Sequence, residues 1–131
     1  MERVVVKLLK VIFTQLPDES VLSISDYIHQ AFGNKCLIDL KNFQRKSEGL
    51  SSATLEFLLT DDCIAYLLNQ LLANPWLIQY LVHYDIKWNN TYLLRVTDEF
   101  CFSISNRFEI PISLIEECKN NEIWIYMEDN P

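Results

Sequence analysis

The feature that most constrains this chain is the alternation of apolar and polar residues in its second half. From Ile78 to Trp88 every second residue is apolar, and shorter alternating runs begin at Tyr92 and Phe100. A period of two places successive side chains on opposite faces of a β-strand. The pattern therefore predicts an antiparallel three-stranded meander over residues 78–105, with one apolar face. Asn74-Pro75 is also a typical helix start, which leaves open whether residues 75–84 are strand or partly helix.

Matching of the apolar faces gives the expected register of this meander. A three-residue loop over residues 89–91 would pair Ile86 with Leu94, whereas a two-residue turn would send the apolar faces of the two strands to opposite sides. We therefore predict the longer loop. The same reasoning predicts a loop over residues 97–99 that pairs Leu94 with Phe102, so that Tyr92, like Trp88, belongs to the apolar face.

Helical periodicity surrounds the meander. Apolar residues recur every three or four positions in several stretches, and Thr60, Ser23 and Ser113 are typical helix-capping residues. The predicted helices are 3–16, 24–32, 61–73 and 114–120. Further strands are expected at 36–43, 53–59 and 122–128. We expect an α+β fold: one domain, 1–131, with an antiparallel sheet of about five or six strands and helices packed mainly on one face.

Composition supports one self-sufficient domain. The chain has 131 residues, half of them apolar, which is enough to bury a core without a metal ion or disulfides. Its four cysteines form no CxxC pair and have no histidine at zinc-ligand spacing, so we expect free thiols, no metal and a cytoplasmic location. The uncharged stretch 63–84 contains several amide side chains, which argues against a membrane span.

Negative charge is concentrated toward the C-terminal end. The net charge is −7, and residues 96–131 alone hold eight Asp or Glu against one Arg and one Lys. Such a field repels nucleic acid and anionic lipid and speeds the approach of a basic protein. We therefore expect a protein-binding protein with no cofactor, no nucleic acid and no membrane partner. In this charge alone the chain resembles bacterial immunity and antitoxin inhibitors, which implies a basic toxin or effector, such as a nuclease, as partner.

The last predicted strand offers candidate contacts for such a partner. Two large aromatic residues stand between carboxylates in the stretch NEIWIYMEDNP, a combination that suits hydrophobic anchors ringed by steering charges. The expected partner-binding residues are Trp124, Tyr126, Glu122, Glu128, Asp129, Glu116 and Glu117. The alternative is that the two aromatics are core residues, as tryptophan is well buried on average. The outcome depends on whether anything covers the second face of the sheet.

That second face could also carry a polar site. In the expected register it holds His83, Asp85, Arg95 and Cys101, with Asp85 opposite Arg95 and Arg95 opposite Cys101. A cysteine and a histidine in contact could act as nucleophile and base in a small enzyme, but here they would lie on the first and third strands, about 10 Å apart. A solvated face with one cross-strand ion pair is the simpler interpretation.

Two further observations bear on the function class. The chain lacks the phosphate-binding, hydrolase and metalloprotease motifs, and it has only two glycines for close backbone approach to a cofactor. We therefore expect no catalytic residue and no enzyme. An acidic homodimeric chaperone for a secreted effector remains an alternative, similar in size and charge to type III secretion chaperones, although two predicted helices precede the first predicted strand.

Overall fold

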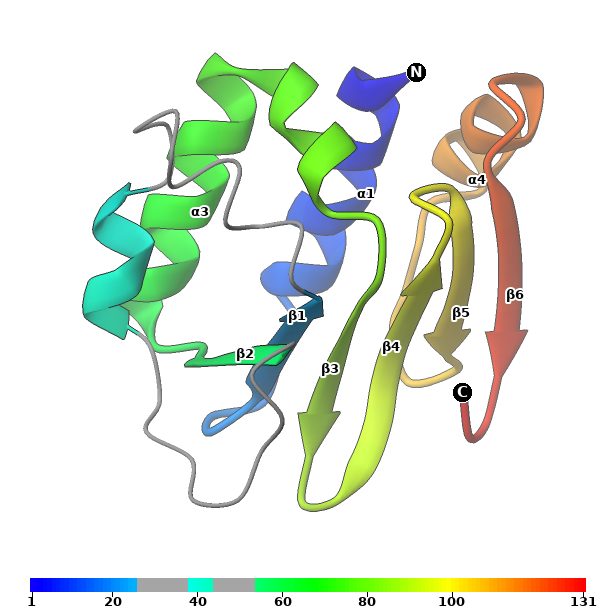
Figure 1. Cartoon of the computed structure of the whole chain (residues 1–131). Coiled ribbons are helices and arrows are strands. Elements are labelled where there is room, and N and C mark those ends of the chain that lie inside the picture. The colour runs from blue at the N-terminus through cyan, green and yellow to red at the C-terminus, as the bar shows by residue number, and fades with distance from the viewer. Residues whose placement is uncertain (26–37, 44–53) are drawn as a thin grey trace.

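A six-stranded sheet organises the part of the chain that the structure, a computed structural model, describes: residues 1–25, 38–43 and 54–131 (Figure 1). Its order is β2-β1-β3-β4-β5-β6, and neighbouring strands are antiparallel except for the parallel pair β5 and β6. The strands are β1 (Val21–Ser25), β2 (Thr54–Leu58), β3 (Tyr84–Trp88), β4 (Thr91–Thr97), β5 (Cys101–Ser105) and β6 (Trp124–Glu128). The predicted α+β fold with a mostly antiparallel sheet is confirmed.

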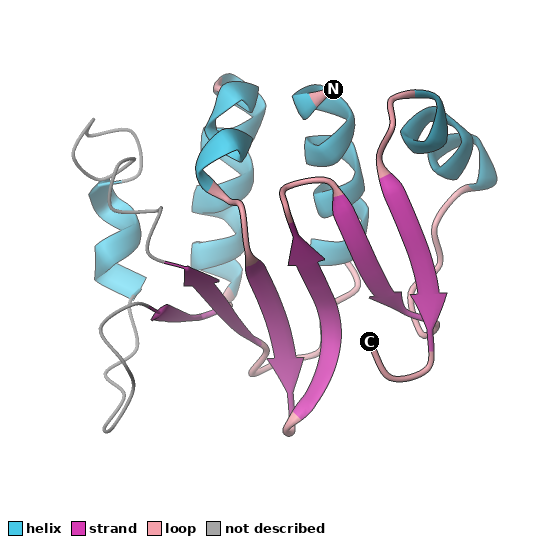
Figure 2. Cartoon of the chain, turned by 45° about the vertical axis from the view of Figure 1, so that its right-hand side comes forward, coloured by secondary structure: helices cyan, strands magenta, loops and turns pink. Residues whose placement is uncertain are grey.

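The helices cover one face of this sheet. The α-helices are α1 (Glu2–Phe13), α3 (Asp61–Ala73) and α4 (Ile112–Asn120), and the 3₁₀ helices are η1 (Ile38–Phe43) and η2 (Pro75–Tyr80). Figure 2 shows α1, α3 and α4 on the same side of the sheet. No helix in the three described ranges combines the length and the apolar character needed to cross a membrane.

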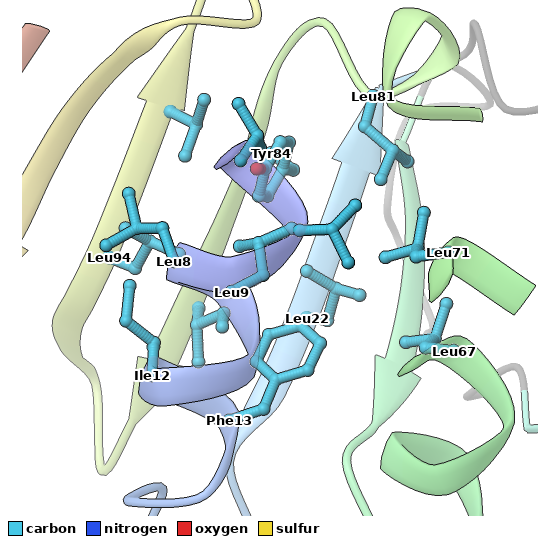
Figure 3. Close-up of a cluster of buried hydrophobic side chains, with 14 of the residues drawn as sticks. Leu8, Leu9, Ile12, Phe13, Leu22, Leu67, Leu71, Leu81, Tyr84 and Leu94 are labelled. Atoms are coloured by element: carbon cyan, nitrogen blue, oxygen red, sulfur yellow. The ribbon is translucent and has the colours of Figure 1, made fainter. Parts of the chain in front are cut away.

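The core lies between α1 and the central strands. Leu8, Leu9 and Ile12 form the buried stripe of α1 and lie over Leu22 and Leu94 of the sheet (Figure 3). The stripe exists because positions three and four apart share one face of a helix. Burial of each such side chain contributes about 1.5–3 kcal/mol to stability. These contacts fix which sheet face is closed and which remains available.

Two helices match their predictions closely. Helix α3 has the predicted bounds, and the Thr60 side chain accepts a hydrogen bond from the Cys63 amide at 3.2 Å, as a helix cap does. Helix α1 is confirmed, although it ends at Phe13 rather than residue 16. Helix α4 begins at Ile112, with Pro111 before it and no side-chain cap. The predicted capping role of Ser113 is therefore wrong.

The predicted helix 24–32 is wrong at its start. Val21–Ser25 forms β1, between β2 and β3 in the sheet, and residues 26–32 lie outside the described residues. Leu22 and Ile24 are buried and alternate with serines, so cross-strand pairing on both sides outweighs the local capping pattern. The predicted strand 53–59 is confirmed as β2.

Two predicted strands differ from the structure in the described residues. Of the strand predicted at 36–43, the described part, residues 38–43, forms the 3₁₀ helix η1. The strand predicted from Ile78 begins only at Tyr84, because Pro75 opens η2. The consecutive residues Leu77 and Ile78 are both buried. Burial of two neighbours fits a helical turn and not the alternating faces of a strand.

The β3–β4 hairpin combines a two-residue turn with a bulge. Residues 89–90 both have positive φ, 50° and 61°, as in the tight turns that asparagine favours. Ile86 pairs with Leu94 as predicted, but the next pair is Lys87 with Tyr92, which leaves one extra residue in β4. The predicted three-residue loop is wrong. The bulge keeps the apolar faces together, and it moves Tyr92 to the side of Lys87.

The β4–β5 register is two residues away from the predicted one. The loop comprises residues 98–100, and Leu94 pairs with Ile104 instead of Phe102. Positive φ at Asp98 and Glu99 forms this turn. The Glu99 amide donates a 2.9 Å hydrogen bond to the carbonyl of Val82, which holds the turn against the chain before β3. A shift of two preserves the faces, because side chains alternate with period two.

Candidate functional site

The sheet has one face turned away from α1, α3 and α4, which we call the open face. Its side chains come from every strand. One cross-strand row is Glu56 on β2, Ser23 on β1, Asp85 on β3, Arg95 on β4, Ser103 on β5 and Tyr126 on β6. In the next row Trp124 of β6 lies beside Cys101 of β5. The two aromatics of the last strand therefore belong to the open face.

Strand β6 forms one edge of the sheet and exposes its aromatic residues. Trp124 is 63% exposed, Tyr126 is 50% exposed and Met127 is 37% exposed. Ile123, just before the strand, is buried, and Ile125 is half-buried beside Phe102. The exposed aromatics are therefore surface residues and not part of the core. We call Trp124, Tyr126 and Met127 the edge patch.

The acidic residues predicted near this patch lie in different environments. Glu116, Glu122 and Glu128 are exposed, and within the described part of the chain no Lys, Arg or His side chain lies within ion-pair distance of them. Asp129 Oδ1 accepts a 2.7 Å hydrogen bond from Asn106 Nδ2. Glu117 is paired with Lys7 of α1. Three of the five predicted carboxylates are therefore available to a partner without breaking a described contact.

Two hollows flank the edge patch. One, of about 590 Å³, is lined by Lys119, Glu122, Ile123 and Trp124 at the start of β6. The other, of about 570 Å³, adjoins Met127 near the end of the strand. Its lining is Phe108, Glu109, Ile110, Pro111, Ile115 and Met127. Most of that lining is apolar, so this hollow suits aliphatic side chains.

A separate polar hollow lies on the open face between β1, β3 and β4. It has a volume of about 290 Å³, and Ser23, Ser25, Asp85 and Arg95 are among its lining residues. Ser25 Oγ and Asp85 Oδ1 are buried, and among the described residues neither atom has a hydrogen-bond partner. Unsatisfied buried oxygens cost about 1–3 kcal/mol each. The hollow thus holds a serine hydroxyl and a carboxylate oxygen that the described residues leave unsatisfied.

The electrostatics of Asp85 follow from this position. Burial raises the pKa of the Asp85 carboxyl above its ordinary value, and the nearby Glu56 carboxylate acts in the same direction. The positive charges of Lys87 and Arg95 oppose this rise in pKa and do not cancel it. Asp85 is therefore a carboxylate that is costly to ionise within the folded chain.

The two cations near Asp85, Lys87 and Arg95, both contact the aromatic ring of Tyr92. The Arg95 guanidinium lies 4.2 Å from the centroid of the Tyr92 ring, and Lys87 Nζ lies 4.7 Å from it. Both are cation–π contacts. Asp85 does lie opposite Arg95, as predicted, but within the described ranges the expected ion pair between them is not formed. The sequence analysis missed this role of Tyr92. The signal for it was the Asn89-Asn90 pair, which favours the two-residue turn that, together with the bulge, places Tyr92 beside Lys87.

The residues of the predicted polar site are only partly together. His83 Nδ1 accepts a 3.3 Å hydrogen bond from the Asp98 amide, and its Nε2 lies 3.9 Å from Asp98 Oδ1. Cys101 lies opposite Thr97 and not opposite Arg95, so that part of the predicted arrangement is wrong. The two-residue change of register is the reason.

In the described ranges, the cysteines and the potential metal ligands form no reactive site. Cys63, Cys101 and Cys118 are free, and Cys36 lies outside the described residues. Burial raises the pKa of both Cys63 and Cys118 to about 11, which disfavours the nucleophilic thiolate. Across residues 1–25, 38–43 and 54–131, no three His, Cys, Asp or Glu side chains are grouped so that they could hold a metal ion.

Comparisons of the chain with protein-family models, with curated proteins and with solved structures found no match.

Proposed function

We propose that this protein is a small acidic binding protein that recognises a positively charged protein surface through β6. The observation that carries the proposal is the exposure of Trp124 and Tyr126 on an edge strand, 63% and 50%. Large aromatic side chains dominate binding energy at protein interfaces when a partner buries them. Two aromatic side chains that are exposed on one strand contribute no burial energy to folding, so their exposure suggests a binding surface.

The charge around these aromatics supports a basic partner. Residues 96–131 carry a net charge of −6, from eight acidic and two basic residues. One of those two cations, Arg107, lies 4.9 Å from the centroid of the Trp88 ring and is thus engaged within the fold. A surface with this excess steers a cationic partner toward itself and repels an anionic one.

This combination suits an inhibitor of the immunity or antitoxin type, acting in the bacterial cytoplasm. Its partner would be a toxin or effector with a basic working surface, such as a nuclease, whose substrate is itself an anion. Trp124 and Tyr126 would supply the contact energy. Glu122, Glu128 and Asp129 would supply the steering, with Glu116 nearby on α4. The absence of enzymatic activity and the homodimeric chaperone alternative both remain predictions.

An affinity experiment with a matched control tests the proposal. The wild-type chain, Trp124→Ala and Trp76→Ala would each be immobilised and exposed to a lysate of the source cells at low salt. Trp76 is also an exposed tryptophan but belongs to η2. We expect a basic protein that wild type and Trp76→Ala retain, that Trp124→Ala does not retain, and that moderate salt releases. A retained partner that is indifferent to Trp124 would contradict the proposal.

A further inference from the structure

Strand β6 is the last strand of the sheet, and no strand in the described part of the chain pairs with its outer edge. The Trp124 amide donates to the carbonyl of Phe100 at 2.8 Å, and the Glu128 carbonyl accepts from the amide of Asn106 at 2.8 Å. Because backbone groups of consecutive strand residues point to alternate sides, residues 124, 126 and 128 face β5. The N–H and C=O groups of Ile125 and Met127 therefore point outward, away from β5. They offer two donors and two acceptors to a further strand.

This edge lacks the usual protection against strand pairing. Natural edge strands carry lysine, proline or a bulge, or lie beneath a helix or loop. Residues 124–128 contain neither lysine nor proline, and the β5–β6 register is continuous. Trp124, Tyr126 and Met127 are exposed, so the strand is not covered. Its one carboxylate is Glu128, whose negative charge would repel an acidic strand and attract a basic one.

The two sides of the edge differ, and this difference defines the occupant. An added strand would place alternate side chains beside Trp124, Tyr126 and Glu128 on the open face. Two aromatic rings and a carboxylate favour lysine or arginine there. The other side chains would lie beside Ile125 and Met127 and the largely apolar hollow of about 570 Å³. The matching segment alternates basic with apolar residues.

A second copy of this chain fits the same edge poorly. Each copy carries a net charge of −7, and Glu122, Glu128 and Asp129 flank β6 at its two ends. Pairing of β6 with its own copy would bring these acids toward each other, which opposes association. The acidic flanks instead complement a basic strand.

We propose that β6 accepts an extended segment of the basic partner as one further strand of the sheet, with basic side chains of the segment on the open face and apolar ones on the helix-covered side. The inference rests on the proposed function and specifies how the partner binds. Main-chain hydrogen bonds would supply affinity, and the alternating side chains would supply specificity.

The experiment uses a defined probe, an eight-residue capped peptide that alternates lysine and valine. A peptide with glutamate in place of lysine is its control. On the protein side Met127→Pro removes an outward N–H, and Met127→Ala removes the side chain but keeps that N–H. Proline is tolerated on an edge strand where its nitrogen faces solvent, so a urea unfolding curve close to that of wild type is expected for both variants.

We expect the lysine peptide to bind and the glutamate peptide not to bind. Met127→Pro should weaken binding about tenfold more than Met127→Ala, because it removes a donor and obstructs the incoming strand. Equal binding by the two variants, or no binding of the lysine peptide, would overturn strand addition.

Amide hydrogen exchange of the wild-type chain gives a second readout that needs no variant to fold. The Ile125 and Met127 amides should exchange fast in the free chain and become protected when the peptide is bound, whereas the Trp124 and Tyr126 amides should be protected in both states. Unchanged exchange at 125 and 127 in the bound state contradicts the inference. Protection of these amides in the chain alone, rising with its concentration, would show a second copy as occupant and would overturn the basic segment.

The outcomes separate this inference from the function on which it rests. A basic protein that depends on Trp124 for binding but leaves the Ile125 and Met127 amides exposed would keep the proposed function and remove strand addition. If no basic protein or peptide binds the chain, both the proposed function and strand addition are wrong.

Discussion

Lys7 Nζ lies 2.9 Å from Glu117 Oε1, an ion pair that joins α1 to α4. The basic side of the first helix is thus partly matched by the acidic C-terminal region of the same chain. Glu117 is therefore committed within the fold and is the weakest of the predicted partner-binding residues.

The ion pair between Lys7 and Glu117 should contribute little to stability. The Lys7 and Glu117 side chains are 58% and 40% exposed, and exposed ion pairs contribute at most about 1 kcal/mol. Lys7→Gln should lower the free energy of unfolding by less than about 1 kcal/mol, and high salt should remove the difference. Urea unfolding at two salt concentrations measures it, with Lys10→Gln on the same helix as the control. A loss that persists in high salt would show that the pair is shielded from solvent.

Trp124 should matter little for stability. Replacement by alanine at such an exposed position is expected to change the free energy of unfolding by no more than about 0.5–1 kcal/mol. Phe102, on the neighbouring strand, is fully buried, and its replacement by alanine should cost about 3–5 kcal/mol. Urea unfolding of both variants tests the contrast. Comparable losses would assign Trp124 to the core.

The acidic flank of β6 should control the rate of association. Removal of Glu122 and Glu128 by a double change to serine should slow binding of a basic partner in low salt and have little effect in high salt. The charge-matched control is Asp39→Ser with Asp62→Ser, on η1 and α3, at the other end of the molecule (Figure 1). Stopped-flow association rates report the difference. If both double variants slow association equally, the effect depends on the net charge of the chain and not on the position of Glu122 and Glu128.

Asp85 should make the chain less stable at neutral pH than an uncharged residue would. Burial, the largest cause, raises its pKa in the folded chain above the ordinary 3.8. An acid with a raised folded pKa loses stability as pH rises from the unfolded to the folded pKa. Asp85→Asn should therefore be more stable than wild type at pH 7, and this advantage should disappear as pH falls below 3.8.

Urea unfolding across that pH range follows the difference between wild type and Asp85→Asn. A variant less stable than wild type at pH 7 would mean that the positive charges of Lys87 and Arg95 outweigh the cost of burying the carboxylate.

The described cysteines should differ in reactivity. Cys63 and Cys118 are buried, with the pKa of each thiol near 11, so few thiolates form at pH 8. Cys101 is only partly buried on the open face. Iodoacetamide should therefore modify Cys101 well before the other two, as peptide mapping by mass spectrometry would show. Modification of Cys63 at a similar rate would indicate frequent opening of the core.

Local chemistry made some elements predictable. The Thr60 hydroxyl and the first-turn acids Asp61 and Asp62 mark the start of α3, and both signals act within four residues. The capping pattern at Ser23 is equally local, yet the strand pairs on both sides of β1 outweigh it. Such pairing depends on residues that lie 29 or more positions away along the chain, which a local pattern does not contain.

The candidate site was predictable in its residue types but not in its exposure. The acidic neighbours of Trp124 and Tyr126 mark them only as candidate anchors, and their alternation with isoleucine places them on one face. Whether that face was covered depended on where every helix packs. The sequence pattern places Tyr92 on the wrong face, because the count of apolar residues does not reveal the bulge in β4. This bulge pairs Tyr92 with Lys87.

The division of the sheet into a covered and an open face has a consequence for how this chain can evolve. Substitutions at Leu22, Ile86 or Phe102 change the packing of the core, so folding restricts them. Substitutions at Trp124 or Tyr126 leave that packing intact. We therefore expect relatives of this protein to diverge fastest along β6, so that a lineage can exchange one partner for another while it retains the same scaffold.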